Sequence, residues 1–193
     1  MKKIGVIDNH DSFVYNLVQL LNETASVSTN VFRNDTLSPD IINRCDALLI
    51  SPGPGLPQDA GDLMPFLKQI YQNIPILGVC LGHQAIAQLF GIGLSHLEQP
   101  LHGHITTLDR VDYRDTLFQN LPLPIRVGRY HSWTVNRAEL ENNPDLTISS
   151  TDEEGHVMSF YHKRYPIHGV QFHPESYMTA NGNLIIRNWI TSL

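Results

Sequence analysis

The residues with the clearest chemical potential surround one cysteine. Cys80 follows an apolar segment and precedes a helical pattern, within the run Gly78-Val79-Cys80-Leu81-Gly82. This run matches the G-x-S-x-G nucleophile elbow, with cysteine in place of serine. The sharp turn exposes the nucleophile, and the helix N-terminus behind it favours a thiolate. A buried structural thiol is the ordinary alternative, and we expect it for Cys45, but the flanking glycines favour a nucleophile at Cys80.

A thiol nucleophile requires a base, and the base requires a group that orients it. His173 lies at the end of an apolar strand pattern, in Gln171-Phe172-His173-Pro174-Glu175. Glu175 is close enough along the chain to fix the tautomer of the imidazole, as an acid does in hydrolase triads. A metal site is the rival interpretation of His-x-Glu, with His102 and His104 as further ligands, but no compact ligand set is evident. We therefore predict a Cys–His–Glu triad and no metal.

The tetrahedral intermediate of such a reaction needs hydrogen-bond donors for its oxyanion. In the elbow arrangement one donor is the amide after the nucleophile, here that of Leu81. The second must come from a nearby loop, and the glycines of Ser51-Pro52-Gly53-Pro54-Gly55 can expose backbone amides. Gly55 is the predicted second donor, although the loop taken alone would pass for an ordinary turn.

The first half of the chain alternates strand and helix patterns. We expect strands at residues 3–8, 27–33, 47–50 and 75–79. The expected helices cover 39–44, 62–71 and 81–90, together with one that Asp11 or Ser12 caps and whose apolar face carries Phe13, Val14, Leu17, Leu20 and Leu21. Such alternation predicts an α/β fold with a mostly parallel central sheet covered by helices on both faces.

After about residue 91 the pattern changes to consecutive strands. These are expected at 105–108, 125–127, 147–151, 157–161 and 167–172, with a hairpin turn at 152–155 and a last helix at 183–190. We predict that they add antiparallel strands to the sheet. Because sites in open α/β sheets lie beyond the carboxyl ends of the strands, loop 51–55, Cys80 and His173 should meet at one edge.

Composition restricts the class of protein. A chain of 193 residues suits a single domain, here residues 1–193. The net charge of −6 and the lack of a basic run argue against nucleic acid or an anionic membrane as partner. Two cysteines cannot build a disulfide framework, and no apolar stretch approaches a signal peptide or a membrane span. We therefore expect a cytoplasmic protein.

Taken together, these elements resemble a class I, or triad, glutamine amidotransferase over essentially the whole chain. Within that family the chain is most similar to the small subunit, component II, of anthranilate synthase and aminodeoxychorismate synthase. The resemblance depends on five segments: Asp8-Asn9-His10-Asp11-Ser12-Phe13-Val14-Tyr15-Asn16, Ser51-Pro52-Gly53-Pro54-Gly55, Gly78-Val79-Cys80-Leu81-Gly82-His83-Gln84, Arg129-Tyr130-His131-Ser132 and Gly169-Val170-Gln171-Phe172-His173-Pro174-Glu175-Ser176.

The resemblance implies roles for individual residues. Cys80, His173 and Glu175 would be the catalytic triad that hydrolyses L-glutamine to glutamate and ammonia. The glutamine-binding residues would be Gly53, Pro54, Gly55, Gln84, Ser132 and Trp133. The chain departs from the family pattern at His10, where Tyr is usual, at Trp133, where Leu is usual, and at His104, where Lys is frequent.

The resemblance also implies a partner. Ammonia would pass to a chorismate-using synthase, component I, which we expect to be a separate polypeptide because 193 residues do not accommodate it. The product would be anthranilate for tryptophan synthesis, aminodeoxychorismate for folate synthesis, or both. The glutaminase half would need no cofactor, whereas the synthase subunit is expected to need Mg²⁺.

Two other functions are compatible with some of these residues. A cysteine hydrolase or peptidase could use the same triad, but Gln84 and the glutamine-loop motif argue against it. A non-catalytic binding or regulatory subunit could share the fold, but such a protein should have lost triad residues, and Cys80, His173 and Glu175 are all present.

Overall fold

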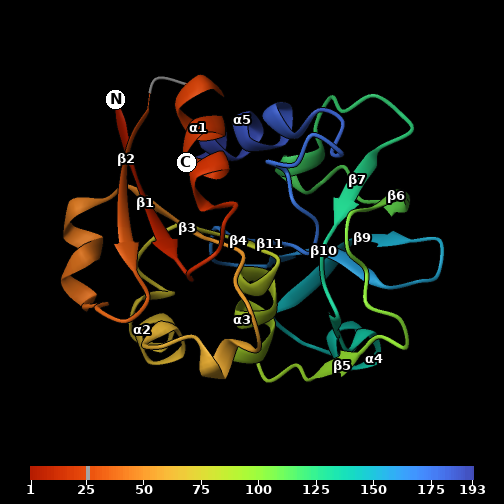
Figure 1. Ribbon diagram of the computed structural model, residues 1–193, viewed down its shortest axis with the longest axis horizontal. Coiled ribbons are helices and arrows are strands. Elements are labelled where there is room, and N and C mark those ends of the chain that lie inside the picture. The colour runs from red at the N-terminus through yellow and green to blue at the C-terminus, as the bar shows by residue number, and fades with distance from the viewer. Residues whose placement is uncertain (25–26) are drawn as a thin grey trace.

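A mixed sheet runs through the molecule (Figure 1). The computed structural model describes residues 1–24 and 27–193, and in these residues the sheet has nine strands. Its first half contains β1 (Lys2–Asp8), β2 (Val27–Arg33), β3 (Ala47–Ile50), β4 (Ile76–Val79) and β11 (Ile167–Val170). These strands are parallel and lie in the order β2-β1-β3-β4-β11.

The second half of the sheet is antiparallel. It contains β10 (Val157–His162), β9 (Leu146–Asp152), β6 (His104–Val111) and β7 (Arg126–Arg129), and it continues from β11 in that order. Every pairing from β11 outward is antiparallel. The predicted fold class, a mostly parallel sheet with added antiparallel strands, is therefore confirmed.

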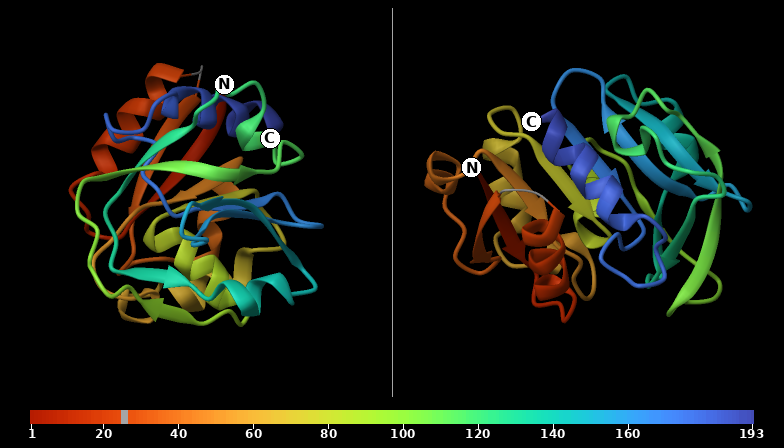
Figure 2. Two further views of the ribbon diagram at one scale, coloured as in Figure 1. Left: turned by 90° about the vertical axis from the view of Figure 1, so that its right-hand side faces the viewer. Right: turned by 90° about the horizontal axis from the view of Figure 1, so that it is seen from above.

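Helices cover both faces of the parallel half. The helices α1 (Val14–Thr24) and α5 (Gly182–Ser192) pack on one face, and α2 (Leu63–Ile70) and α3 (Leu81–Leu89) on the other, together with the short 3-10 helix Pro39–Arg44. In Figure 1 the first pair lies above the sheet and the second pair below it, and the right-hand view of Figure 2 shows α1 and α5 on the near side.

The burial of β3 follows from this layering. Ala47 and Leu49 join the core under α1 and α5, whereas Leu48 and Ile50 join the core under α2 and α3. All four side chains are fully buried, which is why this strand is continuously apolar rather than alternating.

The expected elements all form, with shifted ends. The first helix begins at Val14, and the Asp11 carboxylate accepts a hydrogen bond from the Phe13 amide at 2.8 Å, so Asp11 rather than Ser12 provides the turn before it. The strand expected over 167–172 ends at Val170, because the chain turns toward His173 there. The strand expected over 125–127 is β7, which instead runs to Arg129.

A small second sheet was not predicted. It pairs β5 (Leu94–His96) with β8 (Trp133–Val135), and the short helix α4 (Arg137–Glu141) follows. The 3-10 turns Pro57–Asp59 and Thr116–Phe118 were not predicted either. Among the described residues, no helix is both long enough and apolar enough to cross a membrane.

Candidate active site

Three parallel strands deliver the predicted chemical groups to one edge of the sheet. Ile50 pairs with Gly78, and Val79 pairs with Val170, so β3, β4 and β11 end side by side. Loop 51–55, Cys80 and the segment 171–175 leave from these ends. The structure therefore brings the three predicted segments together, as expected from the carboxyl-end rule.

Cys80 occupies a strained turn between β4 and α3. Its backbone has φ 53° and ψ −101°, a combination that non-glycine residues rarely adopt. The Cys80 amide donates to the Val170 carbonyl at 2.9 Å, and its carbonyl accepts from the Gln84 amide at 3.1 Å. These two bonds anchor the turn to the sheet on one side and to the helix on the other.

The flanking glycines are required by packing. A Cβ atom on Gly78 would lie 2.5 Å from the backbone of Gly82, and one on Gly82 would lie 2.5 Å from the Ile50 carbonyl oxygen. The strand, the turn and the helix thus approach more closely than any side chain permits. This contact explains why the turn has glycine on both sides of Cys80.

His173 and Glu175 form a buried pair beside Cys80. The Nδ1 atom of His173 lies 2.7 Å from Oε1 of Glu175, and the two side chains are 2% and 0% exposed. Burial alone would lower the pKa of His173, but the charge of Cys80 and hydrogen bonds with Cys80 and Glu175 outweigh it and raise that pKa to about 10. The imidazole is thereby held in its charged form beside Cys80.

The second ring nitrogen of His173 faces Cys80. Nε2 is buried without a hydrogen bond of regular geometry among the described residues, yet Cys80 is close enough to shift the pKa of the ring. Catalytic hydrogen bonds are often long before substrate binds. Two aromatic rings also hold the imidazole: the centroids of Phe13 and Tyr130 lie 5.3 and 5.0 Å from that of His173, at steep angles.

The predicted glutamine-binding residues line one pocket with Cys80. Its volume is about 220 Å³, which is the scale of one amino acid. The lining comprises Gly53, Pro54, Gly55, Cys80, Gln84, Tyr130, His131, Ser132 and Trp133. All six residues predicted to hold glutamine therefore lie beside Cys80, and their role in binding stays a prediction.

Of the two predicted oxyanion donors, Gly55 lines this pocket, and Leu81 directly follows Cys80 in the chain. The Leu81 amide belongs to the first turn of α3, where no intrahelical acceptor exists for it. Gly55 has φ +71° and open space at its Cβ position, so a backbone conformation that favours glycine places it on the pocket wall. Gly53 packs against Leu81, with its Cβ position 2.6 Å from the leucine side chain.

Gln171 is a site residue that the sequence patterns did not single out. Its Nε2 atom lies 3.7 Å from Cys80 Sγ, and its Oε1 accepts from Gln84 Nε2 at 3.2 Å. Gln84 also donates to the Trp133 carbonyl at 2.9 Å. In the sequence, Gln171 is a single polar residue between apolar ones, and no pattern apart from its closeness to His173 indicates a function for it.

His131 does not compete with His173 as the base. Arg129 Nε donates to His131 Nε2 at 3.0 Å, and His131 Nδ1 lies 2.8 Å from the Trp133 carbonyl oxygen. Burial and the charge of Arg129 lower the pKa of His131 to about 3. The lone pair on His131 Nε2 already accepts a hydrogen bond from Arg129. This ring therefore supports the pocket wall and is not available to accept a proton.

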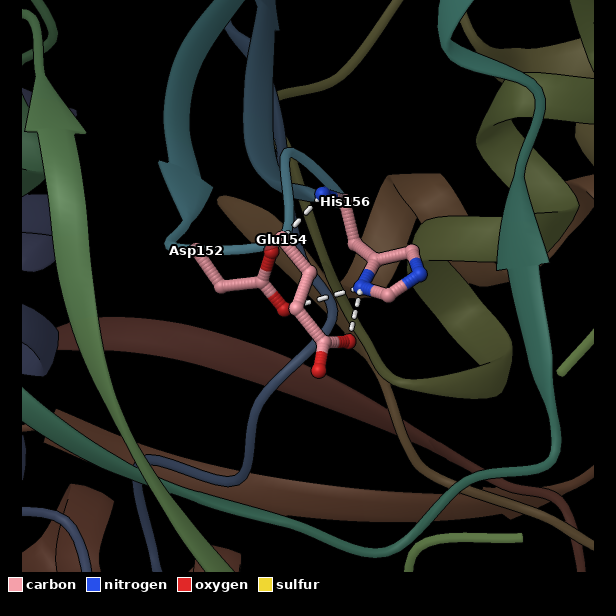
Figure 3. A group of neighbouring side chains, drawn as sticks. All are labelled: Asp152, Glu154 and His156. Atoms are coloured by element: carbon pink, nitrogen blue, oxygen red, sulfur yellow. Dashed lines mark hydrogen bonds and ion pairs between the residues drawn. The ribbon is translucent and has the colours of Figure 1, made fainter. Parts of the chain in front are cut away.

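One group of side chains elsewhere has metal-ligand composition. Asp152, Glu154 and His156 converge at the hairpin between β9 and β10 (Figure 3). Asp152 Oδ2, however, already accepts from Arg129 Nη1 at 2.5 Å and lies 2.9 Å from His156 Nδ1. A cation there would face the guanidinium of Arg129, so this donor set fits a hydrogen-bonded hairpin better than a metal site. His102 and His104 do not belong to it.

Of the three departures from the family pattern, Trp133 lines the pocket beside Cys80, whereas His10 and His104 are not among its lining residues. His10 adopts φ 60°, is exposed, and lies 3.2 Å from Arg33 Nη2. Trp133 contacts His96 edge to face, with centroids 5.0 Å apart. His104 is exposed at the start of β6. Cys45 is partly buried against Gly5, and burial raises the pKa of its thiol, in keeping with a packing role.

Comparison with known proteins identifies the family. The model of the family described as "Glutamine amidotransferase class-I" matches residues 5–193. The chain is 42% identical over 189 residues to the aminodeoxychorismate/anthranilate synthase component 2 of Bacillus subtilis, covering 97% of this chain and 95% of the relative. It is 41% identical to the anthranilate synthase component 2 of Cyanophora paradoxa, covering 98% and 99%.

A solved structure agrees with this assignment. A protein from Thermoplasma acidophilum, described as a subunit of GMP synthase, superposes with a TM-score of 0.86 at 31% identity, covering 99% of this chain and 93% of that one. The chain therefore belongs to the class-I glutamine amidotransferase family. The resemblance drawn from the five sequence segments is confirmed.

Proposed function

We propose that this chain is the glutamine-hydrolysing subunit of anthranilate synthase, with Cys80, His173 and Glu175 as its catalytic triad. One observation carries the proposal: Cys80, beside the buried His173–Glu175 pair, opens into the pocket formed by loop 53–55 and residues 130–133. The relatives named as synthase components 2 extend it from glutamine chemistry to a chorismate-using partner.

The first half-reaction is acylation of the thiol. Cys80 Sγ attacks the side-chain amide carbon of glutamine, and the developing oxyanion accepts hydrogen bonds from the Leu81 and Gly55 amides. The C–N bond then breaks, and the imidazolium of His173 gives its proton to the departing ammonia. A His173 pKa of about 10 suits this role, because the ring is still charged at neutral pH when the leaving group needs a proton.

The second half-reaction releases glutamate. His173, now neutral, takes a proton from water, and the resulting hydroxide adds to the thioester carbon. The C–S bond breaks, Cys80 returns to the thiolate, and glutamate leaves. Glu175, 2.7 Å from Nδ1, orients the ring throughout. The chain's own residues account for every proton in this sequence, so we propose that this half needs no metal or organic cofactor and that any Mg²⁺ requirement belongs to the synthase partner.

One comparison favours a second synthase as the acceptor of the ammonia. The Bacillus subtilis relative is named for both aminodeoxychorismate and anthranilate synthesis, whereas other relatives are named for anthranilate alone. A small subunit serving both pathways is therefore the second candidate function. Capturing the tagged chain with its large subunit, and assaying the complex for both products, decides between them.

The triad is tested in the same complex. We expect Cys80→Ala and His173→Asn each to abolish product formation from glutamine while leaving formation from ammonium salts intact, since only the ammonia source is lost. A matched control is Cys45→Ala, which should retain both activities. Glutamine turnover by purified Cys80→Ala would refute the nucleophile, and peptide or ester turnover by the parent chain would favour the hydrolase rival.

A further inference from the structure

We propose that Gln171 is a further catalytic residue, which donates a hydrogen bond to the Cys80 thiolate and is itself aligned for this task by Gln84. The inference deepens the proposed function, since it adds a group to the same nucleophile. Gln171 is fully buried, and its Nε2 lies 3.7 Å from Cys80 Sγ. It is not among the residues that line the pocket, so we place it behind the sulfur rather than against glutamine.

The direction of each hydrogen bond in this region follows from chemistry. The Trp133 carbonyl can only accept, so the Gln84 atom 2.9 Å from it must be the amide nitrogen. That nitrogen's second hydrogen points to the Gln171 atom 3.2 Å away, which must therefore be the carbonyl oxygen. The remaining end of Gln171, the one facing Cys80 Sγ, is then the amide NH₂.

The hydrogen bond between His131 and the Trp133 carbonyl supports the same orientation of Gln84. Arg129 can only donate, so the His131 nitrogen that faces it carries a lone pair, and the opposite nitrogen carries the hydrogen that reaches the Trp133 carbonyl at 2.8 Å. Both lone pairs of this carbonyl are thus filled, by His131 and by Gln84. Gln84 has no freedom to flip, and it fixes Gln171 in the donating orientation.

A donor at this position stabilises the charged sulfur. Hydrogen bonds to ionised acceptors are stronger than those between neutral groups, particularly in buried surroundings. Cys80 is 6% exposed and Gln171 is 0% exposed, so water contributes little to solvating the thiolate. His173 and Gln171 therefore share this task, and the bond also restricts the sulfur to one position in the elbow.

The pH dependence of Cys80 alkylation tests the proposal directly. Iodoacetamide labelling, quantified at the Cys80 peptide, should reach half its maximum rate about one pH unit higher in Gln171→Met than in the parent, with the same plateau at high pH. Gln171→Glu, an isosteric change that puts an acceptor against the sulfur, should shift the midpoint further. Gln84→Met should shift it less, because the donor is kept but loses its support.

Glutamine kinetics supply a second readout. We expect Gln171→Met to lower kcat at neutral pH by roughly tenfold, with KM for glutamine unchanged. The matched control is Gln88→Met, which makes the same chemical change one turn after Gln84 in α3. The Gln88 side chain is partly buried and makes no hydrogen bond among the described residues. It should leave both readouts at parent values.

Several outcomes would overturn the inference. An unshifted midpoint in folded Gln171→Met or Gln171→Glu removes the donor role, and a rise in KM at constant kcat makes Gln171 a binding residue instead. If Gln171→Met does not fold, Gln171→Glu carries the test, with folding checked by circular dichroism. Alkylation needs neither glutamine nor a partner, so the midpoint remains informative even if the proposed function fails.

Discussion

At Cys80 the chemistry of the site depends on an unfavourable backbone conformation. The φ of 53° with ψ −101° projects the thiol into the pocket, and non-glycine residues in such regions cost on the order of 1–3 kcal/mol. The cost is tolerated because hydrogen bonds to Val170 and Gln84 fix the turn. Strain here is thus part of the site, and it should be measurable.

The strain predicts an inverted order of stability. We expect Cys80→Gly to exceed Cys80→Ala in free energy of unfolding by about 1 kcal/mol, because glycine adopts positive φ freely. At an ordinary helix start the alanine variant would be the more stable of the two, or nearly equal. Urea unfolding of the purified variants measures the difference, and equal or greater stability of the alanine variant would contradict it.

The pKa of His173 makes a second prediction at the residue scale. Because folding raises this pKa from 6.5 to about 10, the stabilisation it supplies is complete below pH 6.5 and is lost as the pH rises toward 10. Glu175→Gln removes one cause of the raised pKa. The stability difference between parent and variant should therefore be widest at or just below pH 6.5 and should narrow toward pH 10.

Chemical unfolding at a series of pH values measures this difference. A gap that widened with rising pH would contradict the assigned sign. In kinetics, Glu175→Gln should be less damaging than His173→Asn, since an amide keeps part of the geometry whereas loss of the ring removes the proton carrier. Asp35→Asn, at an exposed carboxylate paired with Arg33, serves as the charge-matched control.

Sequence patterns reveal some functional residues and conceal others. Cys80 and His173 stand out because each follows an apolar strand with a distinctive neighbour pattern. Gln171 does not, because its task depends on the orientation of Gln84, which is 87 positions away in the chain. Arg129 and Asp152 are concealed for the same reason: their pairing depends on β7 and β9 lying near each other through β6.

At the level of elements, this Arg129–Asp152 pair connects the antiparallel strands to the pocket wall. Both side chains are 2% exposed, and Arg129 also donates a hydrogen bond to His131. Burial raises the pKa of Asp152, but hydrogen bonds from His156 and the charge of Arg129 outweigh it and hold that pKa below its usual value. The carboxylate thus stays charged and keeps Arg129 neutralised.

Removing the carboxylate should affect both stability and substrate binding. We predict that Asp152→Ala lowers the free energy of unfolding by about 3–5 kcal/mol, because it leaves a buried guanidinium without its counterion. It should also raise KM for glutamine, since His131 and the Trp133 carbonyl lose their support. Calorimetry and glutaminase kinetics measure the two effects, and Asp35→Ala, at the exposed Arg33 pair, is the control expected to change neither.

The short strands show where sequence patterns no longer predict secondary structure. The strands β5 and β8 have three residues each, too few for a period of two to be visible, and they exist because each supplies the other's hydrogen bonds. By contrast, β3 and β4 were predicted well, because helices on both faces require continuous apolar runs. Boundaries shifted where tertiary contacts extend or end a strand, as at Val170.

Across the whole molecule, the site lies where the two halves of the sheet meet. The strand β11 pairs in parallel with β4 and antiparallel with β10, so it belongs to both halves. It places Gln171 and His173 beside Cys80, which follows β4. The position of His173 relative to Cys80 therefore depends on how the two halves of the sheet are aligned. Local sequence patterns do not specify this alignment, and β11 provides it.

A contact between distant parts of the chain yields the last prediction. Lys2, at the start of β1, donates from Nζ to the carbonyl oxygens of Ile190 and Leu193 at 2.9 and 2.7 Å. It thus places a positive charge at the C-terminal end of α5, where the helix dipole favours it. This contact holds α5 over the sheet at the edge opposite the active site.

Because the contact is remote from the chemistry, its loss should reduce stability alone. We predict that Lys2→Met lowers the free energy of unfolding by about 0.5–1.5 kcal/mol, the range for a hydrogen bond at a partly buried site, and leaves kcat and KM for glutamine unchanged. Lys3→Met, one residue on and exposed, is the matched control and should be close to the parent. Changed kinetics in a folded Lys2→Met variant would mean that α5 transmits its position to the 171–175 segment, which precedes it in the chain.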